Sequence, residues 1–243
     1  MVVAVPPALT RVMRSVPGVA LVPDGDAPVP SFDFHCSFNG LPRAFETTLE
    51  TIPGATPYLS ADPAMTRRWS ERLPQDGGLR VGLCWAGQAR PWLAGFVGLD
   101  GRRSTSLATL APLGQVPGVR FVSLQKGHAA REKARFVLLD LMADVHDFAD
   151  TAALVANLDL VISVDTSVVH LAGAMGKPVF LLDRYDNCWR WLSGREDSPW
   201  YPSLRIFRQQ RSGEWEPVIA RVATALAAMA GHPSRAPECQ DAA

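Results

Sequence analysis

From residue 79 onward, short apolar runs alternate with longer amphipathic segments. The apolar runs have the length of strands and contain few polar residues, which is typical of strands covered on both faces of a sheet. We expect strands at Arg80–Trp85, Val119–Leu124, Phe136–Leu139, Leu160–Val164, Pro178–Leu182 and Leu204–Phe207. Helical periodicity predicts helices at Leu107–Leu113, Thr151–Leu158, Ser167–Met175 and Pro217–Met229, and a shorter one at Ala129–Arg135. This alternation predicts an α/β fold in which residues 79–230 form a doubly wound parallel sheet.

The pattern of residues 1–78 is less regular. It predicts short strands at Val2–Val5, Ala20–Val22 and Asp33–Cys36, and helices at Pro7–Val16 and Pro63–Leu73. A Gln-Asp-Gly-Gly sequence at residues 75–78 indicates a linker. Because this stretch is too short for a complete doubly wound domain, we expect a partial α/β domain that ends in a linker. The polar, Pro-containing residues 231–243 predict a disordered tail.

Polar or Gly-rich residues follow each of the first four predicted strands of residues 79–230. They form the segments CWAGQ at 84–88, SLQKG at 123–127, DFADT at 147–151 and DTS at 165–167. The carboxyl ends of parallel strands meet at one edge of a sheet, where ligands bind in open α/β folds. We therefore expect the four segments to border one site.

The last of these segments has the clearest chemistry. The run DLVISVDTSVVHLAGAMGKPVFLL predicts a strand, a tight polar turn, a helix and a second strand. Backbone N–H groups at a helix N-terminus, with hydroxyls beside them, bind anions such as phosphates. A structural alternative stays open, in which Thr166 or Ser167 only caps the helix, Asp165 is an ordinary turn residue and His170 is a half-buried histidine.

Composition narrows the class of protein. Basic and acidic residues each number 24 among 243, so no basic excess indicates nucleic-acid binding. The four cysteines are scattered, which argues against a disulfide framework or a zinc site and fits a reducing compartment. No apolar run approaches the roughly 20 residues of a membrane span, and residues 1–7 lack the features of a signal peptide. We expect a cytoplasmic protein without a transmembrane segment.

The stretch DFADTAALVANLDLVISVDTSVVHLAGAMGKPV resembles the C-terminal domain of heptosyltransferase-type glycosyltransferases, the family 9-like enzymes. It is more similar still to bacterial glycosyltransferases that carry tetratricopeptide repeats, and more distantly similar to protein O-GlcNAc transferases. Supporting segments are VGLCWAG, RRSTSLATLAPL, GVRFVSLQKG, WRWL and DSPWYPSLRIFRQ. The resemblance extends over nearly all of residues 1–228. It implies the GT-B architecture, in which two Rossmann-like domains hold a nucleotide-sugar in their cleft and no metal is needed for catalysis.

The resemblance also implies donor-binding residues. The family's Asp-Thr-x-x-x-His pattern falls on Asp165, Thr166 and His170, with Ser167 where heptosyltransferases usually have Gly. Lys126 would pair with the diphosphate, and Gly87 would let the chain pass close to the sugar. Three further residues stand where the repeat-bearing family has a basic segment near the phosphates or the acceptor: Arg102, Arg103 and Ser104.

Other side chains carry open alternatives. Lys126 and the Arg102–Arg103 pair also fit solvated surface charges. Trp189 and Trp191 fit either core positions or a cleft wall, and the core is favoured. His35, in the N-terminal segment, is a candidate for acceptor contact or proton transfer.

The predicted function is metal-independent, inverting transfer of a hexosyl or heptosyl group. The donor is a nucleotide-sugar, and the acceptor is a glycan, a lipid-linked glycan or a protein. Family members begin with a strand and a Gly-Asp turn that this sequence lacks, so we expect a missing N-terminal domain or a partner subunit. The alternative is a truncated, non-catalytic remnant that binds a nucleotide-sugar or a partner. A nicotinamide-dependent oxidoreductase would need a G-x-G-x-x-G turn after a strand, which is absent, and a sugar-nucleotide epimerase has only the architecture in its favour.

Overall fold

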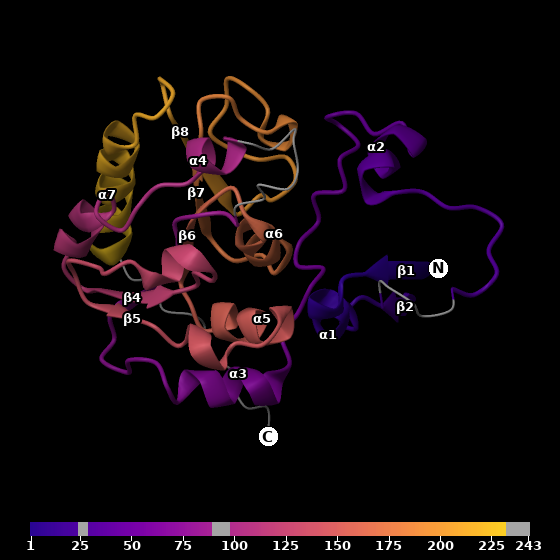
Figure 1. The fold of residues 1–243 in the computed structure, drawn as a ribbon, viewed down its shortest axis with the longest axis horizontal. Helices are drawn as coiled ribbons and strands as arrows, with labels where there is room; N and C mark the ends of the chain where they lie inside the picture. Colours follow the sequence, from indigo (N-terminus) through magenta and orange to yellow (C-terminus); the bar gives the residue numbers. More distant parts are fainter. Residues whose placement is uncertain (24–28, 89–97, 232–243) are drawn as a thin grey trace.

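The computed structural model describes residues 1–23, 29–88 and 98–231 (Figure 1). Its strands are β1 (Val2–Val5), β2 (Ala20–Pro23), β3 (Leu79–Cys84), β4 (Val119–Ser123), β5 (Leu138–Leu139), β6 (Leu160–Val164), β7 (Val179–Asp183) and β8 (Leu204–Arg208). Its α-helices are α1 (Thr10–Met13), α2 (Leu41–Ala44), α3 (Pro63–Ser70), α4 (Leu99–Arg103), α5 (Phe148–Ala156), α6 (Ser167–Ala174) and α7 (Glu216–Gly231). Short 3-10 helices are η1 (Pro7–Leu9), η2 (Phe38–Gly40), η4 (Ala111–Gln115), η5 (His128–Arg131), η6 (Met142–Asp144) and η7 (Trp189–Trp191).

The C-terminal part is built on a six-stranded sheet with the order β5-β4-β3-β6-β7-β8. Every neighbouring pair is parallel. All residues of β6 and β7 are buried, as the sequence predicted for strands covered on both faces. The chain order reverses between β3 and β6, which is where open α/β sheets bind ligands. The predicted parallel α/β sheet is therefore confirmed.

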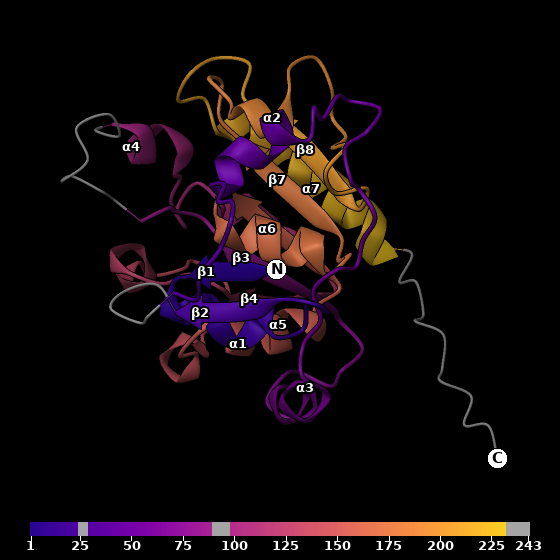
Figure 2. The same ribbon diagram turned by 90° about the vertical axis from the view of Figure 1, so that its right-hand side faces the viewer.

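Two hydrophobic layers enclose this sheet. On one face, strand residues such as Val161 and Leu181 pack with Val155 of α5 and Val169 of α6. On the other face, residues such as Leu160 pack with the leucines of the loop before β4 and with the apolar side of α7. Successive strand residues point to opposite layers, so adjacent residues of β6 belong to different clusters. Figure 2 shows α6 and α7 on opposite sides of β7 and β8.

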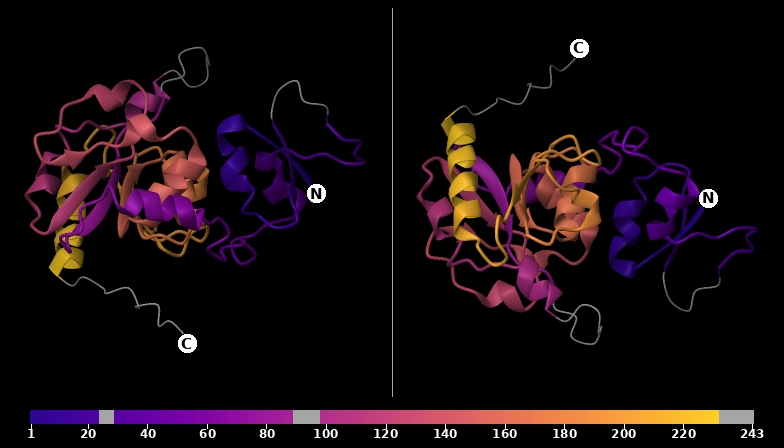
Figure 3. Two further views of the ribbon diagram at one scale, coloured as in Figure 1. Left: turned by 90° about the horizontal axis from the view of Figure 1, so that it is seen from below. Right: turned by 90° about the horizontal axis from the view of Figure 1, so that it is seen from above.

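The N-terminal segment forms a two-stranded parallel sheet of β1 and β2, with α1 beside it. It lies to one side of the larger sheet (Figure 3). Val12 of α1 packs against Ala152 of α5 and Leu171 of α6. Further along the chain, α3 packs on the outer side of α5. The N-terminal segment is thus attached through the two helices that border the switch point of the sheet.

Several predicted elements differ from the structure. Asp33–Cys36 is not a strand, because no other strand pairs with it and its side chains are exposed. Leu107–Leu113 is not an α-helix but a turn followed by η4, since Pro112 lacks the N–H that an α-helix needs in its interior. The predicted strand at Phe136–Leu139 is reduced to β5.

Two helices also begin or end elsewhere. The predicted helix at Pro7–Val16 is split into η1 and α1, and ends at Met13. The helix α5 begins at Phe148 rather than Thr151, because Asp147 caps it. Residues 232–243, predicted to be disordered, lie outside the described residues. Among the described helices, none is both long enough and apolar enough to cross a membrane.

Candidate functional site

A cavity of about 370 Å³ lies at the carboxyl ends of the central strands. Its walls come from the residues that follow β3, β4 and β6, from the first residues of α5 and α6, and from Ala8 in the N-terminal segment. Of the predicted donor-binding residues, it brings together Gly87, Lys126, Thr166 and Ser167. These residues are up to 80 positions apart in sequence, and the parallel sheet places them at one edge.

The N-terminus of α6 opens on this cavity. Thr166 is the N-cap residue, with extended backbone (φ −137°), but its side chain makes no capping hydrogen bond to the helix. Its hydroxyl instead lies 3.1 Å from Oγ of Ser163 and 3.7 Å from Sγ of Cys84. Ser167 and Val168, the first two helical residues, line the cavity. Because no side chain caps these N–H groups, they are available to an anion in the cavity.

The N-terminus of α5 lies at the same cavity but is already occupied by carboxylates. Asp147 accepts hydrogen bonds from the N–H groups of Ala149 and Asp150, at 2.8 and 3.1 Å, and Asp150 completes the capping box. Arg11 of α1 forms ion pairs with both carboxylates, at 2.9 and 3.1 Å. The carboxylates at α5 would repel a second anion, so an anion in the cavity is expected to bind at the N-terminus of α6.

Gln125 ties two of the cavity loops together. It is 3% exposed, and its Oε1 accepts hydrogen bonds from the N–H groups of Trp85 and Ala86, both at 2.9 Å. Its Nε2 donates to the carbonyls of Ala86 and Lys126, at 3.0 and 2.8 Å. The residue was not singled out from the sequence, although the polar Gln125 follows directly on an apolar strand. It fixes the loop after β3 against the loop after β4.

Lys126 is the basic residue of the cavity wall that the sequence assigned to the diphosphate. Its ammonium group donates a hydrogen bond to the carbonyl of Val145. An ammonium group has three N–H donors, so this contact aims the side chain and leaves donors for a ligand.

Arg103 and Ser104 lie beside the cavity and support it. The N–H of Gly87 donates to Oγ of Ser104 at 3.1 Å. Arg103 donates to the carbonyl of Asp165 at 3.2 Å and forms an ion pair with Asp100. A Cβ atom on Gly87 would lie 2.3 Å from Nε of Arg103. The arginine thus joins the loop after β3 to the turn after β6.

Arg102 and Asp165 do not line this cavity either. Arg102 forms an ion pair with Asp186 at 3.0 Å, and both side chains are exposed. Asp165 precedes the N-cap of α6, and its carboxylate lies 3.9 Å from Nε2 of His170. The structure therefore places both residues outside the lining of the cavity.

His170 faces a second cavity, of about 200 Å³. Its Nδ1 is 3.0 Å from the hydroxyl of Tyr201, and its ring stacks on Trp191 with the centroids 5.3 Å apart. Burial lowers the pKa of His170 below its usual value, so the ring is neutral at pH 7. Trp191 is fully buried, as favoured from the sequence, but Trp189 is 55% exposed.

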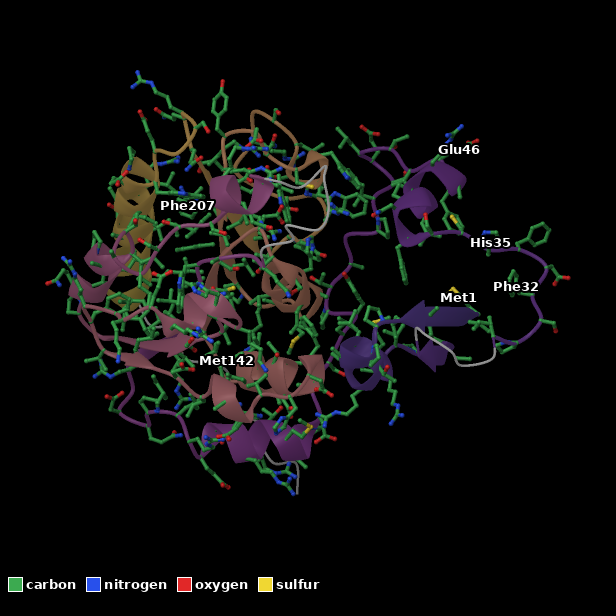
Figure 4. All side chains as sticks on the ribbon, in the orientation of Figure 1. Met1, Phe32, His35, Glu46, Met142 and Phe207 are labelled. Carbon is green, nitrogen blue, oxygen red and sulfur yellow. The ribbon has the colours of Figure 1, made fainter. Side chains whose placement is uncertain are left out.

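His35 is not brought to either cavity. It is an exposed residue whose ring makes an edge contact with Phe32, at 6.0 Å between centroids. Figure 4 shows both residues on the side of the N-terminal segment that faces away from the larger sheet.

The described residues include no group of three or more His, Cys, Asp or Glu side chains that could hold a metal ion. An Asp-Gly-Asp sequence at residues 24–26 lies outside them. Metal independence therefore stays a prediction.

Part of the larger cavity lies in a region of the chain that matches the model of a known protein family. Residues 129–233 match the model of glycosyltransferase family 9 (heptosyltransferase). This region is similar to family 9 glycosyltransferases. The match includes α5, β6 and α6, and so both helix N-termini at the larger cavity.

A curated relative extends the similarity toward the N-terminus. Protein FlbA of Caulobacter vibrioides is 34% identical over 208 residues, which are 80% of this chain and 33% of FlbA. The chain thus spans about a third of the length of this relative. The match to the family 9 model is limited to residues 129–233, and the similarity to FlbA covers a larger part of the chain. The particular closeness to repeat-bearing glycosyltransferases stays a prediction.

Proposed function

We propose that this protein is a glycosyltransferase that binds the diphosphate of a nucleotide-sugar at the N-terminus of α6. The observation that carries the proposal is the uncapped helix start on a cavity at the switch point of the sheet. Thr166, Ser167 and Lys126 border the same cavity. The family match of residues 129–233 supports the reaction class.

The chemistry of the site follows from where charge develops. When the acceptor hydroxyl attacks the anomeric carbon, the bond to the nucleoside diphosphate breaks and its terminal phosphate gains negative charge. The N–H groups of α6 and the ammonium group of Lys126 are fixed before the reaction and oppose this charge. Attack from the opposite side inverts the anomeric carbon. These groups supply the role that a divalent cation has in metal-dependent transfer, so the mechanism needs no metal.

Two side chains that line the cavity, His146 and Asp147, could take the proton of the acceptor, although Asp147 already caps α5 and pairs with Arg11. His35, the candidate from the sequence, lies outside the cavity. The acceptor, whether glycan, lipid-linked glycan or protein, would enter from the side of the N-terminal segment, where Ala8 reaches the cavity.

A second candidate is a non-catalytic protein that binds a nucleotide-sugar or a partner. The two-stranded β1–β2 sheet offers no described acid or base to the cavity. The two candidates agree on donor binding and differ only in turnover.

Saturation-transfer NMR against a panel of nucleotide-sugars tests the shared claim. We expect signal on at least one nucleotide-sugar, competition by the matching nucleoside diphosphate, and the same binding in EDTA. Release of nucleoside diphosphate with an acceptor extract then separates the enzyme from the remnant. Binding that is abolished by EDTA and restored by Mn²⁺ or Mg²⁺ would refute the metal-independent site.

A further inference from the structure

The second cavity has walls of an unusual composition. Four of the side chains that line it are aromatic and come from the segment after β7, namely Trp189, Trp191, Trp200 and Tyr201. The opposite wall contains Phe38, Asn39 and Pro42 from η2 and α2. Figures 1 and 2 both show α2 beside the loops that follow β7. The cavity therefore lies between the N-terminal segment and the larger sheet.

Trp189 is held in a fixed position although it is exposed. The guanidinium of Arg190 lies over its ring, 4.7 Å from the centroid. The ring of Trp200 meets it edge-on, at 6.1 Å between centroids. Trp189 lacks the full burial that usually stabilises a tryptophan side chain. Its contacts with Arg190 and Trp200 hold it where it lines the cavity.

Polar groups stand among these rings. Arg190 donates a hydrogen bond to Oδ1 of Asn39 at 3.2 Å, across the two sides of the cavity. His170 contributes a neutral imidazole to the wall. Small-molecule sites combine apolar and aromatic walls with a few polar groups that fix orientation. A volume of about 200 Å³ suits one ring and not a peptide segment.

The two cavities share the first turns of α6. Thr166, Ser167 and Val168 line the larger cavity, and His170 lines the aromatic one. A ligand with its diphosphate at the start of α6 can therefore place its next ring toward the aromatic walls. An acceptor ring bound there would equally lie next to the diphosphate.

We propose that the aromatic cavity is a subsite for a pyranose ring, with Trp189 as its stacking wall. A pyranose presents C–H bonds on its faces, which suit an indole ring, and hydroxyls at its rim, which suit Asn39, Arg190 and His170. The proposal rests on the proposed function, and it covers two sources of the ring: the sugar of the donor, or a sugar of the acceptor.

The test compares matched probes on three variants. ADP, GDP and UDP, then ADP-glucose, GDP-mannose and UDP-N-acetylglucosamine, are titrated calorimetrically, and the methyl glycosides of the same sugars are examined by saturation-transfer NMR. Trp189→Ala removes the stacking wall, and Trp189→Phe retains an aromatic face. Tyr185→Ala is the matched control, because Tyr185 is 57% exposed nearby in the chain and lines neither cavity.

We expect Trp189→Ala to leave nucleoside diphosphate affinity within about twofold and to weaken sugar binding by roughly tenfold, with partial recovery in Trp189→Phe. Loss on the nucleotide-sugar identifies the donor ring, and loss on the methyl glycoside identifies an acceptor ring. The subsite is refuted if no probe depends on Trp189, or if nucleoside diphosphates weaken as much as nucleotide-sugars. Glycoside binding through Trp189 without any nucleoside diphosphate binding would instead count against the donor site at α6.

Discussion

Residue 87 is a glycine because Arg103 occupies the space that a side chain would need. The guanidinium also reaches the carbonyl of Asp165, next to the proposed diphosphate turn. Neither contact follows from the local sequence, where Arg103 fits a solvated surface charge. The arginine thus acts through the loops that it joins and does not line the cavity itself.

A double-mutant cycle tests this role. Gly87→Ala should push the Arg103 guanidinium away from Asp165 and weaken nucleoside diphosphate binding by roughly threefold to tenfold. In an Arg103→Ala background the same change should have little effect, which gives a coupling free energy on the order of 1 kcal/mol. Calorimetric titration of the four proteins measures it. Additive effects would mean that Gly87 matters for another reason.

Asp183 should make the free energy of unfolding depend on pH, and a single substitution can separate its contribution from that of other groups. Its side chain is fully buried at the end of β7 and pairs with Arg208 at 2.7 Å, but burial dominates and raises its pKa from 3.8 to about 6. The folded protein therefore binds more protons than the unfolded chain between these values. The stabilising contribution is fully present below about pH 3.8 and is lost as pH rises through 6.

Replacing Asp183 with Asn should remove this dependence. The unfolding free energy of the wild type, relative to Asp183→Asn, should fall by up to about 1.4 kcal/mol per pH unit between the two pKa values. Urea unfolding of both proteins from pH 3.5 to 7 measures the difference. A difference that stays constant, or that grows with pH, would contradict the burial argument.

The sequence predicted which residues line the cavity better than it predicted the residues that hold its loops and helices in place. Gly87, Lys126, Thr166 and Ser167 each follow a strand, so the rule of strand ends was enough to group them. Gln125 and Arg11 were not identified, because Trp85 is 40 residues from Gln125 and Asp150 is 139 residues from Arg11, so these partners come together only in the folded chain. The sequence also did not predict that His170 lines the aromatic cavity, because its partners Trp191 and Tyr201 are distant in the chain.

At the level of elements, α6 depends on a close approach to Tyr201. A Cβ atom on Gly173 would lie 2.5 Å from the ring of Tyr201, which in turn bonds to His170. The glycine therefore lets the helix approach the segment that forms the aromatic wall.

Gly173→Ala should destabilise the protein even though alanine favours helices. The propensity gain is about 1 kcal/mol, but overlap with the ring costs roughly 1–3 kcal/mol in a packed core. The matched control is Gly101→Ala in α4, where a Cβ atom meets nothing within 4 Å. Urea unfolding should show a loss for Gly173→Ala and none for Gly101→Ala. Equal effects would show that the Tyr201 contact is relaxed in solution.

Element types followed from hydrophobic pattern, and the errors have specific causes. Strands β3, β4, β6, β7 and β8 were predictable because short, mainly apolar runs are typical of strands in a covered sheet. The predicted helix at Leu107–Leu113 was wrong because Pro112 lacks the N–H that the interior of an α-helix needs, whatever the spacing of the leucines. The predicted strand at Asp33–Cys36 failed because no neighbouring strand pairs with it.

In the molecule as a whole, the N-terminal segment is the least buried part of the described chain. It exposes large apolar side chains, among them Phe32, Phe34, Phe38 and Phe45. A two-stranded sheet buries little area, which is why such units rarely stand alone. The expectation of a further domain or partner subunit remains a prediction.

Arg11 should hold this segment to the larger sheet through Asp147 and Asp150. Arg11→Ala should speed hydrogen exchange of the α1 amides. Because the two ion pairs of Arg11 are partly exposed, their loss should lower the free energy of unfolding by only about 1 kcal/mol or less. Arg72→Ala is the control, because Arg72 pairs with Asp144 away from α1. Unchanged exchange in α1 would show that apolar packing alone attaches the segment.

The central claim, a diphosphate held by the start of α6, is tested most directly at Ser167. This residue is exposed and is the first of the helix, so Ser167→Glu adds negative charge where the phosphates would bind. Ser167→Gln is the neutral control of nearly equal size. The carboxylate should not harm the unliganded protein, because it suits the helix dipole.

The measurement is calorimetric titration of nucleoside diphosphates into the wild type and both variants, with thermal unfolding of each protein alone. The account predicts a loss of at least about tenfold in affinity for Ser167→Glu, a much smaller loss for Ser167→Gln, and unchanged melting. Equal affinity in the wild type and Ser167→Glu, with normal melting, would show that the start of α6 holds no phosphate and that the donor binds elsewhere.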